Sequence, residues 1–460
     1  MKWNNLSLHK IKWICSFIVV LLPFFCSISN IFQKYLAVTL WAIMMWMFEL
    51  LPEEIVAIML PGLYILFDIT NYATAFSAWT TSTPWITLGG LMIGGMIVKS
   101  GLVLRIAYKS LLLTKGSLKG IVWGIVLTCT IFTPLIPSIM AKVALLVPVV
   151  IGICKVLKVE AKSATASALM LVVFFALWSP KMAFMTASTD SILTAGILEQ
   201  YLGVKITWLA WAKDMFIPGI LWMLVSIPLI YILRPQHLNL NKEYLKIEYR
   251  KLGKITIDEK KTVTLITALL ILLIFSSWHK LPEGVLMLGI GCLGFFPGIG
   301  LLKSDDFSKI QFKVVFFLAG AVTIGAVASS IRITESVINF VQPYFEQMNS
   351  YELVMSIYIF SILANFLLNP LALIATLMIP IANLCSNLGY SATIGGYSMI
   401  MGFNQALFPY EIAPLMLVYG FGYLKLTHLI KVMVFRVVAG IIFMTVVTYP
   451  YWLYIGLLDK

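Results

Sequence analysis

A single lysine stands in a long stretch of the sequence that carries no other charge. Between Ile121 and Cys154 the only charged residue is Lys142. An ammonium group is costly to bury among apolar residues, and inside a membrane such a group usually serves transport or ion binding. We therefore predict that Lys142 contacts an anionic substrate. The alternative is that this stretch lies near the membrane surface and that the side chain snorkels to water.

Two carboxylates stand beside apolar runs that are long enough to form helices. Asp190 follows the apolar run 163–179, and Glu411 shortly precedes Pro414. A carboxylate in an apolar setting takes up a proton more readily than one in water. We therefore predict that Glu411 carries a proton and in this way couples transport to an ion. The alternatives are an outward loop position for Asp190, with Lys181 as its partner, and a cytoplasmic helix end for Glu411.

The second half of the chain offers amides where charges are missing. No residue from 353 to 410 is charged, and the polar donors there include Asn365, Asn369, Asn404 and Gln405. Amide side chains often join membrane helices to one another through hydrogen bonds. Each of these four residues therefore has two interpretations, a substrate contact and a bond between helices.

The amino-acid composition indicates the kind of protein that must hold these candidate residues in place. Of the 460 residues 60% are apolar and only 12% are charged, whereas soluble domains have about 25% charged residues. A chain so poor in charge cannot cover a surface that faces water. We therefore predict an all-α polytopic membrane protein, with the lipid bilayer as its first partner.

Other classes of function lack their motifs. The six cysteines form no CxxC pair, the four histidines are scattered, and no GxxxxGK[ST] phosphate loop is present. We expect no cofactor, no metal, no nucleic-acid partner and no enzymatic activity. The net charge of +13 arises from short Lys/Arg clusters between apolar runs, which is typical of cytoplasmic loops that face anionic lipid.

Apolar runs of membrane-spanning length predict about eleven spans. The candidates are 12–29, 35–51, 54–71, 84–101, 163–179 continuing to 191–198, 208–233, 262–279, 284–302, 312–330, 391–408 continuing to 414–424, and 428–456. Two uncharged stretches with internal prolines, about 121–154 and 352–386, are predicted to be re-entrant hairpins. If these two stretches are hairpins, the Lys/Arg clusters all lie on the same side of the membrane. We expect a multi-pass protein of the cell membrane with a cytoplasmic N-terminus and an outside C-terminus.

The two halves of the sequence resemble each other. The segment LPEEIVAIMLPG (51–62) is similar to LPEGVLMLGIGC (281–292), and residues 76–102 are similar to 307–331. The halves would enter the membrane from opposite sides, as the inverted repeats of secondary transporters do. We predict an N-terminal helix (1–34), a first repeat (35–233), a cytoplasmic linker (234–261) and a second repeat (262–460).

At these positions the chain resembles the divalent anion/sodium symporter family, whose members carry dicarboxylates, citrate and sulfate. The resemblance covers roughly 35–456. In the family each hairpin tip carries Ser-Asn-Thr followed by Pro-Ile. Here the first tip has Ser138 and Pro148, with Ile139 and Met140 in place of Asn and Thr. The second tip keeps Pro-Ile at 380–381.

The second tip and the helix breaks depart further from the family pattern. Pro370, Leu371 and Ala372 replace Ser-Asn-Thr, although Asn369 stands one position earlier. The family's Thr-Pro-Pro-Asn breaks correspond to TASTDSILTAGIL, with Ser191 at the Asn position, and to PYEIAPLMLVYGFGYL around 418–424. The scaffold therefore matches while most of the polar signature is replaced.

The resemblance implies an elevator mechanism and a homodimer, and it completes the candidate site. The expected substrate-binding residues are Ser138, Lys142, Ser191, Asn369, Asn404 and Gln405, and the expected ion-coupling residues are Asp190 and Glu411. Because the replaced tip residues supply no side-chain oxygen, we expect no sodium coupling. We expect Lys142, paired with Asp190, to stand where the family binds a sodium ion.

The sequence thus predicts a secondary transporter of small anions, either di- and tricarboxylates or oxyanions, that works by exchange or with protons. Two alternatives remain at this point. One is a carrier of a non-anionic solute, and the other is a transport-dead relative that acts as a membrane sensor or assembly partner. A membrane enzyme is a weaker third, because no catalytic set of side chains can be placed together.

Overall fold

The protein is helical, as its composition predicts. The computed structural model describes residues 2–459 except 49, 115, 239, 241, 334 and 337–341. In these residues the regular structure consists of helices, without a β-strand. The prediction of an all-α polytopic membrane protein is therefore confirmed.

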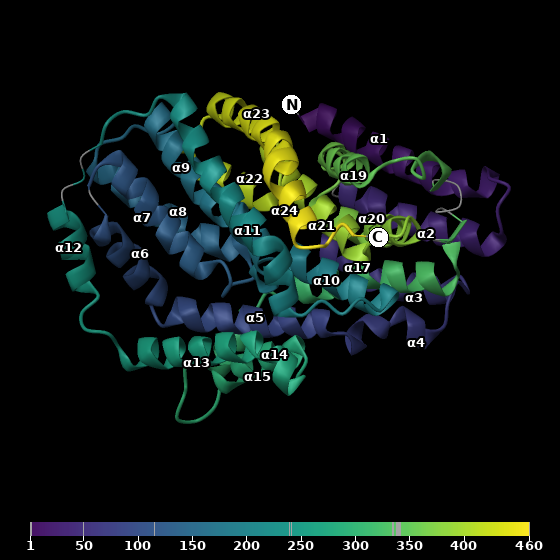
Figure 1. Ribbon diagram of the computed structural model, residues 1–460, viewed down its shortest axis with the longest axis horizontal. Helices are drawn as coiled ribbons and strands as arrows, with labels where there is room; N and C mark the ends of the chain where they lie inside the picture. The colour runs from purple at the N-terminus through teal and green to yellow at the C-terminus, as the bar shows by residue number, and fades with distance from the viewer. Residues whose placement is uncertain are drawn as a thin grey trace.

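The first half of the chain contains the following helices (Figure 1): α1 (Lys2–Leu21), η1 (Leu22–Phe25), α2 (Asn30–Met47), α3 (Glu53–Leu66), α4 (Tyr72–Ala75), η2 (Ser77–Thr80), α5 (Ser82–Lys99), α6 (Leu102–Leu113), α7 (Leu118–Phe132), α8 (Ile139–Val156), α9 (Ala164–Trp178), η3 (Pro180–Ala183), η4 (Met185–Ala187), α10 (Thr189–Leu202), α11 (Trp208–Ser226) and η5 (Ile227–Leu233).

The second half follows a similar order of elements. Its helices are α12 (Lys242–Lys251), α13 (Ile257–Ile274), α14 (Ser276–His279), α15 (Glu283–Leu293), α16 (Ser304–Phe307), α17 (Phe312–Ser330), η6 (Gln342–Tyr344), α19 (Ser350–Ala364), α20 (Pro370–Asn387), α21 (Ala392–Phe403), η7 (Pro409–Glu411), α22 (Ala413–Gly420), α23 (Leu426–Phe443), η8 (Met444–Thr448) and α24 (Tyr449–Tyr454).

Several helices are suited to cross a bilayer. In the described part of the chain six helical segments are long and apolar enough to do so, and a seventh is obtained if α5 and α6, which are bent by 65°, form one span. Shorter apolar helices such as α7, α15 and α19 add to the apolar body. The number of about eleven spans stays a prediction.

Both uncharged stretches are interrupted where their prolines stand. Helix α7 ends at Phe132 and α8 begins at Ile139, with Ser138 capping α8 by accepting the N–H of Ala141 at 3.2 Å. Asn369 caps α20 in the same way, through a 2.9 Å bond from the N–H of Ala372. Such caps satisfy backbone donors that a helix start leaves free. That each helix pair turns back inside the membrane stays a prediction.

The contacts between the two halves are reciprocal. Helix α3 packs against α17, and its counterpart α15 packs against α5, the counterpart of α17. Likewise α8 contacts α22 while α20 contacts α10. Two repeats related by a two-fold axis would produce this exchange of partners. The contacts are consistent with the predicted repeats, whose inverted orientation stays a prediction.

Glycines permit the closest of these crossings. A Cβ atom on Gly89 of α5 would lie 2.3 Å from the carbonyl carbon of Met287 in α15, and one on Gly90 would lie 2.2 Å from the ring of Pro137 at the first tip. A Cβ on Gly320 of α17 would lie 2.2 Å from the carbonyl oxygen of Ala57 in α3. At these three positions a side chain would push neighbouring segments apart, so glycine permits the close packing.

Gly89→Ala is expected to destabilise the protein by about 1–3 kcal/mol, because the added methyl group would force two backbones apart. The matched control is Gly62→Ala in α3, where an added Cβ meets nothing within 4 Å. That change should be neutral or slightly stabilising, since glycine is unfavourable inside a helix. Thermal unfolding of both purified variants in detergent measures the difference. Equal midpoints would contradict the packing described here.

The linker between the halves is fastened to α6. Helix α12 packs on α6 (Figure 1), and Arg105 of α6 donates to Glu259 of α13 at 2.5 Å and to the carbonyl of Gly253 at 3.0 Å. Burial alone would raise the pKa of Glu259, but the bonds from Arg105 and from the N–H of Thr256 outweigh it and hold that pKa below its usual value. The linker is thus tied to α6 by the bonds from Arg105 to Gly253 and Glu259.

Candidate functional site

The two helix breaks meet at the centre of the protein. The first break lies between α9 and α10, and the second between α21 and α22. The indole N–H of Trp178 donates to the carbonyl of Asn404 at 3.0 Å, and the Asn404 amide donates back to the carbonyl of Trp178 at 3.0 Å. This reciprocal pair joins the C-terminal end of α9 to that of α21.

A buried arginine from α23 holds both breaks together. Arg436 is fully buried and donates to the backbone and side-chain oxygens of Asn404, both at 2.6 Å. It also donates to Gln405 at 3.2 Å and to the hydroxyl of Ser179 at 3.0 Å. Its guanidinium carbon lies 4.8 Å from the ring centroid of Trp222, a distance at which cation–π attraction adds to the hold.

Arg436 is absent from the candidates that the sequence suggested. An arginine near the middle of the predicted span 428–456 is the same signal that singled out Lys142, so it could have been found. Its binding partners could not, because Ser179, Asn404 and Gln405 come from two distant parts of the chain.

The predicted substrate residues Asn404 and Gln405 are engaged by the protein itself. The side-chain oxygen of Asn404 accepts from Arg436 and, at 2.9 Å, from the indole N–H of Trp222. These bonds make Asn404 a junction between α9, α11, α21 and α23. The interpretation as a bond between helices therefore describes this arrangement, and substrate contact by Asn404 and Gln405 stays a prediction.

Lys142 is buried where the first tip meets the first break. Its side chain is 1% exposed, and its Nζ atom lies 3.2 Å from the carbonyl oxygen of Ala187 and 3.5 Å from that of Thr133. Thr133 follows α7 and Ala187 precedes α10. The ammonium thus lies between main-chain oxygens of two segments, the environment that a bound cation would have.

The predicted ion pair between Lys142 and Asp190 is wrong. Asp190, in the first turn of α10, pairs instead with Lys181 of η3, and both side chains are buried. Lys181 lies in the first helix break, nine residues before Asp190, so the pair joins this break to the start of α10. Its Nζ also lies 3.2 Å from the ring centroid of Trp178. The alternative partner for Asp190 is therefore the one observed.

Glu411 organises the second break. One carboxylate oxygen accepts the backbone N–H groups of Leu407 at 3.0 Å and Phe408 at 2.7 Å, and the other accepts from the amide of Asn365 at 3.2 Å. The same amide also donates to the carbonyl of Gln405 at 3.2 Å. Glu411 is buried and thereby ties the end of α19 to the break. Ion coupling by Glu411 or Asp190 stays a prediction.

The remaining candidates lie around this centre. Ser191 is buried beside Asp190, and its hydroxyl lies 3.0 Å from that of Ser188. Ser138 and Asn369 are partly exposed at the two tips, where they cap helices. The amide of Asn369 also donates to the carboxylate of Glu53 at 2.9 Å. The structure therefore gathers most candidates at the breaks and leaves two at the tips.

Two buried basic side chains at the centre form no ion pair in the described part of the chain. Lys181 and Asp190 neutralise each other, whereas Lys142 and Arg436 take part in none of the ion pairs within 4.0 Å in the described part of the chain. Glu411 is the remaining buried acid here, and it is bonded to N–H groups of neutral residues. A buried positive charge favours a small anion. Among the described residues no group of three or more His, Cys, Asp or Glu side chains could hold a metal.

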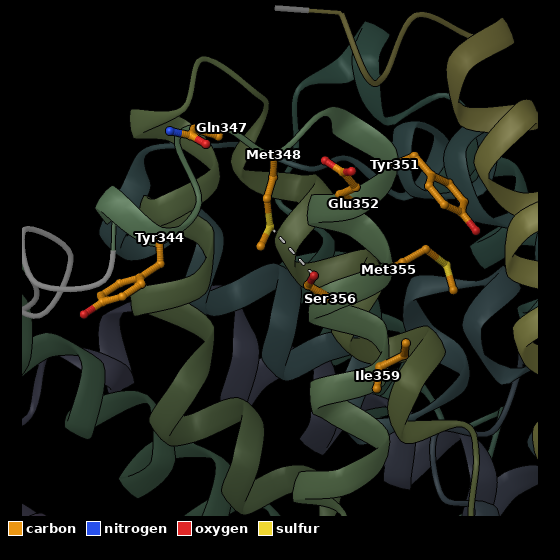
Figure 2. Close-up of a pocket in the computed structure, with 8 residues that line it drawn as sticks. All are labelled: Tyr344, Gln347, Met348, Tyr351, Glu352, Met355, Ser356 and Ile359. Carbon is orange, nitrogen blue, oxygen red and sulfur yellow. Dashed lines mark hydrogen bonds between the residues drawn. The ribbon is translucent and has the colours of Figure 1, made fainter.

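A surface hollow lies apart from this centre. Its volume is ≈ 550 Å³, and it is lined along the start of α19 by Tyr344, Gln347, Met348, Tyr351, Glu352, Met355, Ser356 and Ile359 (Figure 2). The hydroxyl of Ser356 donates to the sulfur of Met348 at 3.8 Å, the dashed line in Figure 2. None of the candidate site residues lines this hollow, so it is not the substrate site predicted from the sequence.

Comparison with known proteins gives a consistent set of relatives. A family described as "Sodium:sulfate symporter transmembrane region" matches residues 4–458. Dicarboxylate transporter 1, chloroplastic, of Spinacia oleracea is 26% identical over 53% of this chain and 44% of its own length. The L-tartrate/succinate antiporter of Escherichia coli K12 is 23% identical over 94% of this chain and 96% of its own. A putative malate transporter of Bacillus subtilis is 22% identical over 49% and 48%.

The matched regions differ in extent. The chain spans 44% of the length of the Spinacia oleracea transporter, 38% of that of dicarboxylate transporter 1, chloroplastic, of Arabidopsis thaliana, and 50% of that of a membrane protein of Cupriavidus necator.

Proposed function

Because this chain belongs to the sodium:sulfate symporter family of membrane transporters, we propose that it exchanges small dicarboxylates across a membrane without sodium. The substrate class rests on relatives that are named as carriers of dicarboxylates, malate, tartrate and succinate. The positive centre at the two helix breaks suits a dianion. Transport by an elevator movement and assembly as a homodimer are part of the same proposal.

The buried ammonium of Lys142 is the observation that carries this proposal. A sodium ion in such a carrier is held by oxygen atoms of unwound backbone near a helix break. Here the carbonyl oxygens of Thr133 and Ala187 already accept hydrogen bonds from the Nζ atom of Lys142. The protein's own side chain thus supplies the positive charge that a coupling ion would otherwise bring.

Exchange follows from the same fixed charge. In this proposal Lys142 and Arg436 carry a positive charge that the empty carrier leaves uncompensated, because neither has a carboxylate partner among the described ion pairs. Moving an uncompensated charge through a low-dielectric barrier is costly. A bound dicarboxylate neutralises this charge, so the loaded carrier crosses more easily than the empty one. The binding site is therefore expected to return to the first side of the membrane only when another anion occupies it.

The orientation in the membrane belongs to this proposal as well. We keep the cytoplasmic N-terminus, the cytoplasmic 234–261 linker and the outside C-terminus, which follow from the Lys/Arg distribution. Two residues suited to labelling tests of this topology, Asn241 and Lys460, lie outside the described residues. Asp459 is described and can serve in place of Lys460.

Counterflow in proteoliposomes tests the function. Labelled succinate is expected to enter vesicles that are preloaded with unlabelled succinate, and to enter empty vesicles at least tenfold more slowly (about 1.4 kcal/mol or more in barrier height). The controls are protein-free vesicles and the variant Lys205→Met, which removes an exposed lysine that is not among the candidate residues. Equal uptake into empty and loaded vesicles would exclude exchange. No uptake of succinate, malate or tartrate by folded protein would reject the substrate class.

A further inference from the structure

A cavity borders the first hairpin tip. It has a volume of ≈ 510 Å³, within the range of about 300–1,000 Å³ that is usual for small-molecule sites. Its walls come from α5, from the tip and from the segment 302–311. At the tip it is lined by Ile136 and Ala141, which lie on either side of the cap residue Ser138. The cavity thus reaches the first turn of α8 at Ala141, the residue that precedes the buried Lys142 in sequence.

Three charged residues line the part of this cavity that is formed by α5 and the segment 302–311. The carboxylate of Asp306 pairs with Lys99 at the end of α5 and lies 3.6 Å from the ammonium of Lys309. The side chains of Lys99 and Lys309 are 40% and 74% exposed, whereas that of Asp306 is 18% exposed. These three groups carry a net charge of +1 (two lysines minus one aspartate).

We propose that this cavity is the vestibule through which the anion reaches the first tip, with Asp306 occupying the two lysines until a substrate carboxylate displaces it. The inference rests on the proposed anion transport. It adds an access route and three residues that select the charge of what enters. Lys99 and Lys309 are the ligands for the incoming carboxylate, and Asp306 competes with it.

The energetics suit such a displacement. Ion pairs that are open to water contribute little, typically about 0–1 kcal/mol, so an incoming carboxylate loses little when it replaces Asp306. A positive mouth on a cavity with apolar walls raises the local concentration of anions within a Debye length, about 8–10 Å. The walls supply no competing acid, since the other lining residues are apolar or neutral: Leu91, Met92, Gly94, Gly95, Val98, Ile136, Ala141, Leu302, Ile310 and Gln311.

Cysteine labelling measures the charge in the vestibule without any substrate. Ala141→Cys is the reporter, in a background where the exposed Cys15, Cys26 and Cys292 are replaced by serine, because the other three cysteines are buried. The rates of an anionic and a cationic methanethiosulfonate reagent are compared at low salt. We expect the ratio of the anionic to the cationic labelling rate to be higher for this cysteine than for a free thiol in solution.

Substitutions at the mouth should move this ratio in opposite directions. Asp306→Asn raises the charge of the lining by +1, and a unit charge that acts over about 10 Å of water changes each rate about twofold and the ratio about fourfold, towards the anionic reagent. Lys309→Gln should lower the ratio by a similar factor. The matched control is Lys313→Gln, which removes an exposed lysine in the first turn of α17 that does not line the cavity. Gln311→Cys serves as a second reporter if Ala141→Cys does not fold.

The outcomes separate this inference from the proposed function. A ratio equal to that of the free thiol and unmoved by Asp306→Asn and Lys309→Gln would overturn the vestibule, even if the protein exchanges dicarboxylates. Protection of both reporters from both reagents would overturn it too. A ratio that shifts as expected supports the vestibule, and a failure of dicarboxylate counterflow in the same preparation would then count against the proposed function alone.

Discussion

Lys142→Ala is expected to abolish dicarboxylate exchange and to make the stability of the protein depend on sodium. The substitution removes the fixed positive charge and strands the carbonyl oxygens of Thr133 and Ala187 in a buried space. Each buried acceptor without a donor costs about 1–3 kcal/mol. A sodium ion that enters the vacated space would be held by these main-chain oxygens. The variant should therefore melt at a higher temperature in sodium chloride than in choline chloride.

Lys142→Met is the matched control for this experiment. Methionine fills much of the same space but carries no charge, so it should lose exchange as Lys142→Ala does and show no response to sodium. The unmodified protein should melt at the same temperature in both salts. Exchange at the normal rate by Lys142→Met would contradict the role of the ammonium.

The buried pair of Lys181 and Asp190 is expected to show strong energetic coupling. Removing one partner of such a pair leaves the other charge buried and unpaired, which typically costs about 3–5 kcal/mol. Lys181→Met and Asp190→Asn should each destabilise the protein by about that amount, and the double variant should cost clearly less than the sum of the two. Thermal unfolding of the four proteins in detergent gives the coupling energy.

Two further cycles sharpen this test. The exposed pair of Lys251 and Glu248, with a nitrogen–oxygen distance of 2.6 Å, should show no measurable coupling, because water screens it. A cycle of Lys142→Met with Asp190→Asn should show much weaker coupling than the Lys181 cycle. Strong coupling of Lys142 with Asp190, together with additive effects of Lys181 and Asp190, would contradict the observed pairing.

Local chemistry made much of the fold predictable. Prolines and cap residues determine where the uncharged stretches break, so the helices begin after Ser138 and Asn369 as their types suggest. The similarity between LPEEIVAIMLPG (51–62) and LPEGVLMLGIGC (281–292) likewise matched α3 with α15, whose contacts with α17 and α5 are reciprocal. These features depend on a few neighbouring residues, which is why the sequence reveals them.

The pairing of buried charges was less predictable. Lys181 and Asp190 are nine residues apart across an irregular break, where the helical spacing rules do not apply. Arg436 binds residues that are 31, 32 and 257 positions away. Glu411 was chosen for its apolar surroundings, but its bonds to backbone N–H groups depend on how the second break turns. Such partners follow from the three-dimensional arrangement of several helices.

The most direct test of the central claim is the rate of succinate counterflow as sodium is replaced by choline at constant ionic strength on both sides of the membrane. Since Lys142 supplies the positive charge at the first tip, the account predicts the same rate at every sodium concentration in the unmodified protein. A steep and saturable increase with sodium would contradict it, because a coupling ion would then be required despite the resident ammonium.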